Sequence, residues 1–271
     1  MNEAAESGYT IADLIRVMQR LRDPEHGCPW DRQQDFRSIV PSTLEECYEL
    51  AHAIEHDDFD HVAEELGDVL FQVIFYAQLG SERDLFDFDK VVHILVEKLV
   101  RRHPHVFAAG QIEGIVGDEV EVAEVNATWE SIKQQERGSR EQHGALDDVP
   151  VALPALPRAQ KLQKRAARVG FDWRQSEQVM GKLDEEIAEL RVALANQDAP
   201  AVREEMGDLL FTCVNLSRHL HLDAEGALRD ASSKFERRFR AMESIAAGQN
   251  LELAALDDAA LDDLWEQAKR P

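Results

Sequence analysis

The sequence has few cysteines, no long apolar run and little positive charge. Its three cysteines, Cys28, Cys47 and Cys213, are widely separated and form no Cys-x-x-Cys pair, which excludes a disulfide framework and a zinc knuckle. We expect reduced thiols that mostly fill the core. No apolar run approaches the roughly 18 residues of a membrane span, and the acidic, polar N-terminus does not resemble a signal peptide. These absences predict a cytoplasmic protein.

Acidic residues outnumber basic residues by 53 to 30, which gives a formal net charge of −23. A surface of this sign repels nucleic-acid backbones and offers no basic patch to an anionic membrane. We therefore expect neither a nucleic-acid polymer nor a membrane as a partner, and a phosphate-bearing ligand needs local cations or a metal. The apolar fraction of 44% in 271 residues is typical of a globular protein with one large domain or two ordinary ones.

The chain contains an internal repeat, in which four matches occur in the same order. Two acidic motifs recur with an offset of 140 positions, and a basic pair and a tryptophan recur with an offset of 136 positions. The matched segments are Glu45-Glu46-x-x-Glu49 with Glu185-Glu186-x-x-Glu189, Glu65-Leu-Gly-Asp68 with Glu205-Met-Gly-Asp208, Lys98-x-x-x-Arg102 with Lys234-x-x-x-Arg238, and Trp129 with Trp265. Between the copies, residues 138–144 are polar and contain two glycines, which predicts a first domain over residues 1–144 and a second over 145–271.

Apolar residues recur at three- and four-residue spacing in both halves, which predicts an all-α fold of two repeated helical bundles. The segment 69–77 is apolar on almost every side, so we expect other helices to enclose it, either from the second copy or from a homodimer partner. Helix starts are predicted at a capping box of Ser42 and Glu45, at Asp58, at Asp87 and near Ser176, with ends near Glu55, Leu79 and Arg102, and a further helix carries Trp129.

Helical spacing gathers the carboxylates of each copy. Residues three and four positions apart share a helix face, so Glu185, Glu186 and Glu189 form one patch, and Glu205 and Asp208 form another on the next helix. Any single motif of this kind is typical of a solvated helix face, but its recurrence favours a site where a divalent cation offsets the repulsion. Carboxylates without thiolate or imidazole favour Mg²⁺, or else Mn²⁺, which points to phosphoryl or nucleotidyl chemistry.

Several other side chains are candidates for nucleotide contacts. Lys234 and Arg238 share one helix face, where they either grip distal phosphates or pair with surface glutamates. Trp265 either stacks on a base or packs within the domain. Lys182 can reach a phosphate, whereas the first copy has Ser42 at the matching position, which indicates that the two sites have diverged.

At these residues the sequence resembles the MazG family of nucleoside triphosphate pyrophosphohydrolases, whose hallmark is Glu-Glu-x-x-Glu followed by Glu-x-x-Asp on adjacent helices. The segment from Arg20 to Asp31 resembles the start of the first domain in two-domain members, and Lys234 to Phe239 resembles the phosphate-binding helix of the second. The resemblance implies an all-α fold that dimerises and hydrolysis of nucleoside triphosphates to monophosphate and pyrophosphate. ATP is an implied substrate, with deoxynucleoside or aberrant triphosphates as further candidates.

The resemblance also implies that the second copy is catalytic. Water attacks the α-phosphorus and pyrophosphate leaves, with Glu185 helping to orient the water. The family pattern has a basic residue just before the second Glu-x-x-Asp, but Ala201 stands there, with Arg203 nearby. The implied Mg²⁺ ligands are Glu186, Glu189, Glu205 and Asp208, and the implied nucleotide contacts are Lys182, Lys234, Arg238 and Trp265.

Two other functions fit parts of the sequence. A di-iron or di-manganese carboxylate bundle uses Glu-x-x-His motifs, which Glu49-x-x-His52 resembles, but Val192 matches His52 in the second copy. A regulatory binding module with vestigial metal sites is the other alternative, since duplication does not require both copies to work. The first copy accordingly carries an active, a regulatory or a vestigial site, formed by Glu45, Glu46, Glu49, Glu65, Asp68, Lys98 and Arg102.

Overall fold

The computed structural model describes residues 8–269 apart from 116–120, 122–123, 126–127, 130, 133–135, 137–143 and 148. The chain forms two compact units, residues 1–135 and 136–271. The described residues contain no β-strand, only an isolated antiparallel bridge between Phe107 and Ile115. The prediction of an all-α fold is therefore confirmed, whereas a boundary between residues 144 and 145 stays a prediction.

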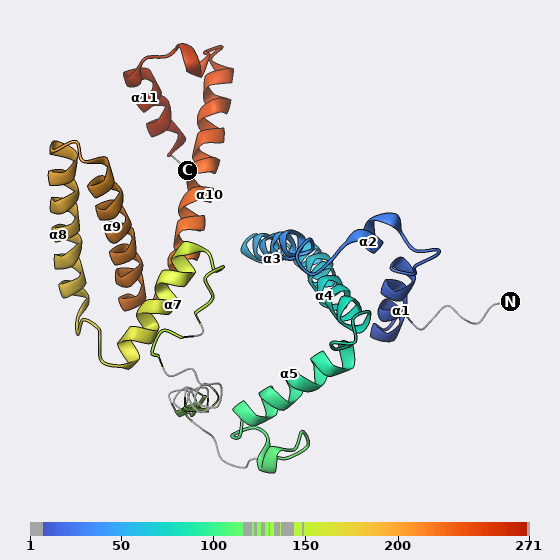
Figure 1. Cartoon of the computed structure of the whole chain (residues 1–271). Helices are drawn as coiled ribbons and strands as arrows, with labels where there is room; N and C mark the ends of the chain where they lie inside the picture. The colour runs from blue at the N-terminus through green and yellow to red at the C-terminus, as the bar shows by residue number, and fades with distance from the viewer. Residues whose placement is uncertain are drawn as a thin grey trace. The chain divides into compact units, whose positions relative to one another are not determined.

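In the first unit, two long antiparallel helices, α3 and α4, carry the first copy of the acidic motifs, and α1 packs against α4 (Figure 1). The helix expected around Trp129 lies in a stretch of which only some residues are described. The elements of this unit are α1 (Ile11–Leu21), α2 (Pro29–Gln33), α3 (Val40–Glu55), α4 (Phe59–Ser81), α5 (Phe88–Arg102) and the 3₁₀ turn η1 (Ala108–Gly110).

The second unit repeats this arrangement. Helices α8 and α9 form the matching antiparallel pair, and α7 packs against α9 (Figure 1). Helix α11 packs along the C-terminal half of α10. The elements of this unit are α7 (Ala155–Arg168), α8 (Ser176–Ala195), α9 (Ala199–His219), α10 (Ala224–Gly248), the 3₁₀ turn η2 (Leu253–Ala255) and α11 (Asp258–Ala268).

The same tight turn joins the two acidic helices in both units. Asp57 and Gln197, which are 140 positions apart, both take left-handed backbone angles, with φ of 53° and 54°. The next residue caps the following helix in each unit: the Asp58 carboxylate accepts from the His61 N–H, and Asp198 accepts from the Ala201 N–H. The turn therefore sets the register between the two helices that hold the carboxylates.

Local capping explains where the helices begin. Asp58 and Asp87 are N-caps as predicted, and α8 begins at Ser176. The capping box at Ser42 was wrong, because α3 begins two residues earlier, at Val40, and its N-cap Ile39 makes no side-chain capping bond. Proline is well suited to the first turn of a helix, and Pro41 occupies it here.

The first unit has an apolar core between α1 and α4. The partly buried Tyr76 packs against this core, and its hydroxyl lies 3.0 Å from Thr43 Oγ1 on α3, within hydrogen-bond distance. Arg22 closes the edge of this core, with its guanidinium 5.3 Å from the centre of the Phe75 ring and two bonds of 2.7 Å to Glu82. The core residues are Met18, Ile39, Ile74, Phe75 and Leu79.

In the second unit, a buried cluster joins α10 to α11 through Met242, Ala246 and Leu264. The interface between α7 and α9 contains instead two buried amides, Gln163 and Asn215. The first unit also buries an amide on α4, since Gln72 is 6% exposed and its Oε1 has no partner among the described residues. Buried polar side chains reduce stability unless they are fully hydrogen-bonded.

Large apolar side chains remain exposed on the acidic helix pairs of both units. Enclosure of the segment 69–77 is therefore incomplete within the first unit, and its covering by another helical surface stays a prediction. The cysteines Cys47 and Cys213 are also exposed, contrary to the prediction that they fill the core. No helix among the described residues is long and apolar enough to cross a membrane. The exposed apolar residues on α4 and α9 include Leu66, Leu70, Val73, Met206, Leu210 and Phe211.

Candidate metal and nucleotide site

Three carboxylates from adjacent helices converge in the second unit. Glu186 comes from α8 and Glu205 and Asp208 from α9, and one oxygen of each lies within 4.8 Å of the others. Glu186 is only 4% exposed, whereas Asp208 is open to solvent. Hard oxygen donors at this separation are within reach of a single divalent cation. The structure thus brings together three of the four predicted metal ligands.

The fourth predicted ligand, Glu189, lies one turn beyond Glu186 and acts on the same group through its charge. Burial, and then the charges of Glu189, Glu186 and Asp208, raise the pKa of Glu205 above its ordinary value. A raised carboxyl pKa means that the ionised form is unfavourable here, which a bound cation would reverse. Both the donor chemistry and the electrostatics therefore fit a divalent metal.

Lys182 supplies a positive charge to this group from within the chain. Its Nζ lies 2.9 Å from Oε1 of Glu185 and 2.9 Å from Oε1 of Glu186. The hydrogen bond to Glu186, followed by that to Glu185, raises the pKa of Lys182, so the ammonium stays charged. The sequence suggested a phosphate as the partner of Lys182, and the structure shows carboxylates one helical turn away.

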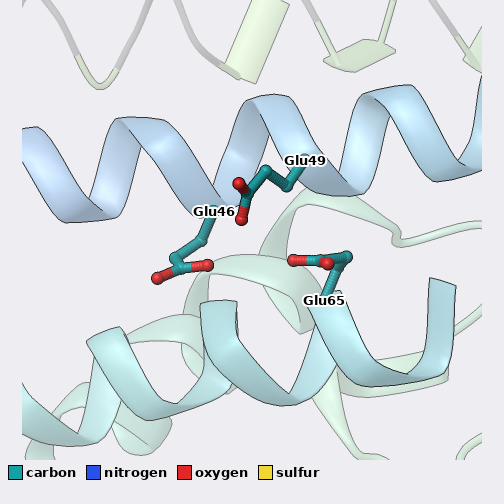
Figure 2. A group of neighbouring side chains, drawn as sticks. All are labelled: Glu46, Glu49 and Glu65. Atoms are coloured by element: carbon teal, nitrogen blue, oxygen red, sulfur yellow. The ribbon is translucent and has the colours of Figure 1, made fainter. Parts of the chain in front are cut away.

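The first unit holds a similar group without that lysine. Figure 2 shows Glu46 and Glu49 on α3 and Glu65 on α4, with their carboxylates turned towards one another between the helices. One oxygen of each lies within 4.8 Å of the others, and Oε2 of Glu65 is buried with no hydrogen-bond partner among the described residues. Ser42 occupies the position that corresponds to Lys182.

The first unit therefore lacks the relief that Lys182 gives the second, although the charge of His61 opposes the repulsion at Glu65. Burial, and then the charges of Asp68, Glu49 and Glu65, raise the pKa of Glu46, and burial with Glu49 and Asp68 raises that of Glu65. His52 does not join this group, because its exposed ring lies against His56 with centroids 4.1 Å apart. The convergent donors are carboxylates, as expected for Mg²⁺ or Mn²⁺ and unlike a carboxylate–histidine iron site.

The other predicted contacts lie on α10 and α11. Lys234 is exposed and Arg238 half-buried, and neither forms an ion pair within the part of the chain that the structure describes. Trp265 packs on the α10–α11 cluster, with its ring 5.4 Å from that of Phe235. Nothing described here joins these three residues to the carboxylates. Their counterparts Lys98 and Arg102 are half-buried on α5.

The structure contains one polar group that no sequence motif indicated. Asp172 pairs with Arg218 through both guanidinium nitrogens, and Arg218 Nε donates to Oδ1 of the buried Asn215 at 3.0 Å. Arg218, through its hydrogen bond, holds the pKa of Asp172 below its ordinary value against the opposing effect of burial. The repeat offset contained a signal, because Asn215 stands where the first copy has the core residue Phe75.

Comparison with known proteins adds to this geometry. A family profile described as the MazG nucleotide pyrophosphohydrolase domain matches residues 34–107 and again residues 174–242. The chain is 51% identical over 262 residues to a nucleoside triphosphate pyrophosphohydrolase of Escherichia coli (strain K12), covering 96% of this chain and 97% of that protein. It is 44% identical over 264 residues to the Thermotoga maritima nucleoside triphosphate pyrophosphohydrolase/pyrophosphatase MazG, covering 97% of both. The uncharacterized YabN protein of Bacillus subtilis is 42% identical, with 96% of this chain matching 52% of YabN. The two matched segments contain the two acidic helix pairs.

Proposed function

The chain belongs to the MazG nucleotide pyrophosphohydrolase family, and from that premise we propose that it hydrolyses nucleoside triphosphates to monophosphate and pyrophosphate in its second copy. The observation that carries the proposal is the convergence of Glu186, Glu205 and Asp208 beside Lys182. The proposed substrates include ATP, with deoxynucleoside or aberrant triphosphates as further candidates. The proposed catalytic domain is 145–271, and 1–144 is the other MazG-like domain.

The proposed metal is Mg²⁺, with Mn²⁺ as a substitute, because only hard oxygen donors converge on the site. When bound, Mg²⁺ polarises a phosphoryl oxygen and lowers the pKa of an attacking water. Its proposed ligands are Glu186, Glu189, Glu205 and Asp208.

The remaining residues position the substrate and the water. Lys182 holds Glu185 beside Glu186, so the exposed Glu185 carboxylate is placed to orient a water. Lys234 and Arg238 lie four residues apart on α10 and can donate to phosphate oxygens, since no ion pair within the described chain occupies them. Trp265 is the remaining proposed nucleotide contact. A homodimer is proposed because exposed apolar faces on α4 and α9 require a covering surface.

The test is product analysis with a pair of repeat-matched variants. The full chain is incubated with each common nucleoside triphosphate and Mg²⁺, and monophosphate, diphosphate, pyrophosphate and phosphate are resolved. We expect monophosphate and pyrophosphate, lost in Glu189→Ala and retained in the matched control Glu49→Ala. Loss only in Glu49→Ala would move catalysis to the first copy. Diphosphate with phosphate would show that a different bond is broken, and no metal-dependent turnover would leave a binding module as the better description.

A further inference from the structure

The second unit contains a cavity of about 330 Å³ where the segment before α7, the C-terminal half of α7, the segment before α8 and α9 meet. A volume of this size lies at the lower end of the range for small-ligand pockets, roughly 300–1,000 Å³. Most of the wall is apolar, and three of its side chains are aromatic. The lining residues on which the argument rests first are Leu146, Leu162, Gln163, Phe171, Trp173 and Phe211.

The two charged residues in the lining, Asp172 and Arg218, neutralise each other. Both terminal guanidinium nitrogens of Arg218 donate to the Asp172 carboxylate, one of them at 2.9 Å, and Arg218 Nε donates to Asn215 Oδ1 at 3.0 Å. No cation in this wall is therefore left for a phosphate, so the cavity is suited to an uncharged molecule. The same ion pair fixes the segment of Phe171 and Trp173 against α9, which makes the aromatic wall a preformed one.

One hydrogen-bond acceptor in the wall lacks a donor. Gln163 is 6% exposed, and its Nε2 donates to the Phe211 carbonyl oxygen at 2.8 Å. Its Oε1 is buried and has no partner among the described residues. A buried acceptor without a partner carries a desolvation cost, which a donor on a ligand would remove. The wall therefore favours a ligand that combines an apolar ring with one N–H group.

The first unit also has a hollow, of about 260 Å³, against α1 and α4, but its walls are different. Polar walls supply the two to four partners that an ordered water needs, whereas an apolar cavity binds apolar molecules such as benzene. Of these two hollows, the cavity of the second unit is thus the one suited to an aromatic ligand. The polar residues that line the hollow of the first unit are Gln19, Gln78, Ser81, Asp87 and Asp89.

We propose that the cavity of the second unit binds a small, uncharged heteroaromatic molecule with one N–H donor, of which indole is the simplest representative. The ring packs against Phe171, Trp173 and Phe211, and the N–H donates to Gln163 Oε1. The cavity lining contains none of the carboxylates of the acidic cluster, so this site is separate from the proposed metal and nucleotide site and does not depend on the proposed function.

The test compares indole with benzofuran, which has the same shape and no N–H. Binding of each probe to the full chain is measured by ligand-observed NMR titration. We expect indole to bind about 10-fold more tightly, corresponding to about 1.4 kcal/mol. Gln163→Met removes the acceptor at nearly constant volume and should make the two affinities equal. Gln160→Met, on the same helix outside the lining, is the matched control and should keep the preference for indole.

A second variant tests the aromatic wall. Phe171 is 79% exposed, so Phe171→Ala should fold, and it should weaken both probes by about the same factor because the donor contact is unchanged. Val169→Ala is its matched control, since Val169 is 67% exposed on the same segment and lies outside the lining. Thermal melting reports whether each variant folds.

The proposal is overturned if indole binds no better than benzofuran, if the preference survives in folded Gln163→Met, or if Phe171→Ala leaves both affinities unchanged. A cavity that a second copy of the chain fills with its own side chains would bind neither probe, which would also overturn it. AMP with Mg²⁺ should not displace indole, because the wall has no cation for the phosphate. Displacement by AMP would show that the cavity belongs to the nucleotide site and would defeat the assignment.

Discussion

The acidic groups of the two copies have nearly the same ligands but different charge balance. The acidic cluster is formed by Glu46, Glu49 and Glu65 in the first copy and by Glu186, Glu205 and Asp208 in the second, each between two helices joined by the same tight turn. In the second copy Lys182 contacts two glutamates at 2.9 Å, whereas in the first Ser42 brings no charge. Duplication thus preserved the donors for a cation and changed the electrostatic setting in which they act.

The difference indicates which copy is suited to chemistry. A catalytic site must hold its carboxylates in place while a charged substrate binds and leaves. A lysine that contacts these carboxylates helps to hold them. A site without it depends on metal alone to relieve repulsion, which is adequate for structural binding. Changing one residue at a time tests this contrast.

The largest effect is expected from exchanging the residues that differ. Lys182→Ser should lower kcat/KM for nucleoside triphosphates roughly 10- to 100-fold, the loss typical of removing a group that orients metal ligands, because Lys182 holds Glu185 and Glu186. Ser42→Lys, at the repeat-matched position, should leave kcat/KM unchanged. Steady-state kinetics with saturating Mg²⁺ measures both, and Lys182→Arg should restore part of the activity by keeping the charge. An active Lys182→Ser variant would show that the lysine does not distinguish the copies.

The next largest effect is a difference between the two copies in how much metal binding slows their hydrogen exchange. A ligand present at about ten times its Kd stabilises the folded state by about 1.4 kcal/mol. Hydrogen exchange with and without Mn²⁺ should show slower exchange in α3–α4 and, to a smaller degree, in α8–α9, because Lys182 already relieves part of the repulsion. Glu65→Gln should abolish the effect in α3–α4 only. Equal protection of both helix pairs would contradict the role given to the lysine.

A smaller effect is expected from pH in the metal-free protein. The pKa values of Glu46, Glu65 and Glu205 are raised in the folded state, so their contribution to stability is full below the unfolded pKa and is lost as pH rises through the folded pKa. The melting temperature should therefore rise as pH falls from about 7 to about 5. Asp58 and Asp172, whose pKa values are lowered, oppose this only at lower pH.

Glu65→Gln should reduce the pH dependence of the melting temperature, because it removes one of the three carboxyl groups with raised pKa values. The hydrogen bond to Asp58, the main cause of the raised pKa of His61, stays in place. Saturating Mn²⁺ should reduce the pH dependence as well, since the cation favours the ionised carboxylates. A melting temperature that falls steadily over this range in the metal-free protein would show that the clusters are not electrostatically strained.

Local rules predicted the parts of the site that lie within a helix or across one turn. The i, i+3 spacing places Glu205 and Asp208 on one face of α9, and the short turn after α8 brings that face beside Glu186. The capping aspartates Asp58 and Asp87 likewise mark where their helices begin. The failure at Ser42 has a local cause too, since proline at position 41 allows the helix to begin earlier than the capping-box pattern indicates.

The cavity could not be predicted because it depends on contacts between distant segments. Gln163 and Phe211 are 48 positions apart, and nothing in the periodicity of α7 indicates that its buried face meets α9 across a hollow. The same holds for Asp172 and Arg218, which are joined only by the packing of the second unit. The one sequence signal for this part of the second unit is the repeat, in which the polar Asn215 matches the apolar Phe75.

The smallest predicted effect concerns the glycines of the Glu-x-Gly-Asp motifs. Interior helix glycine costs about 0.5–1 kcal/mol relative to alanine, yet a Cβ at Gly67 or Gly207 would meet nothing within 4 Å in this chain. Gly207 adjoins the exposed Met206 and Leu210, so a close approach of the second chain in the proposed homodimer would account for the glycine. Gly181→Ala, on the charged side of α8, should therefore raise the free energy of unfolding by about 0.5–1 kcal/mol. Gly67→Ala and Gly207→Ala should raise the free energy of unfolding by less. They should also lower the fraction of dimer that sedimentation measures. Equal gains at all three positions with unchanged sedimentation would show that these faces stay open, and a penalty in one copy alone would identify which helix pair forms the interface.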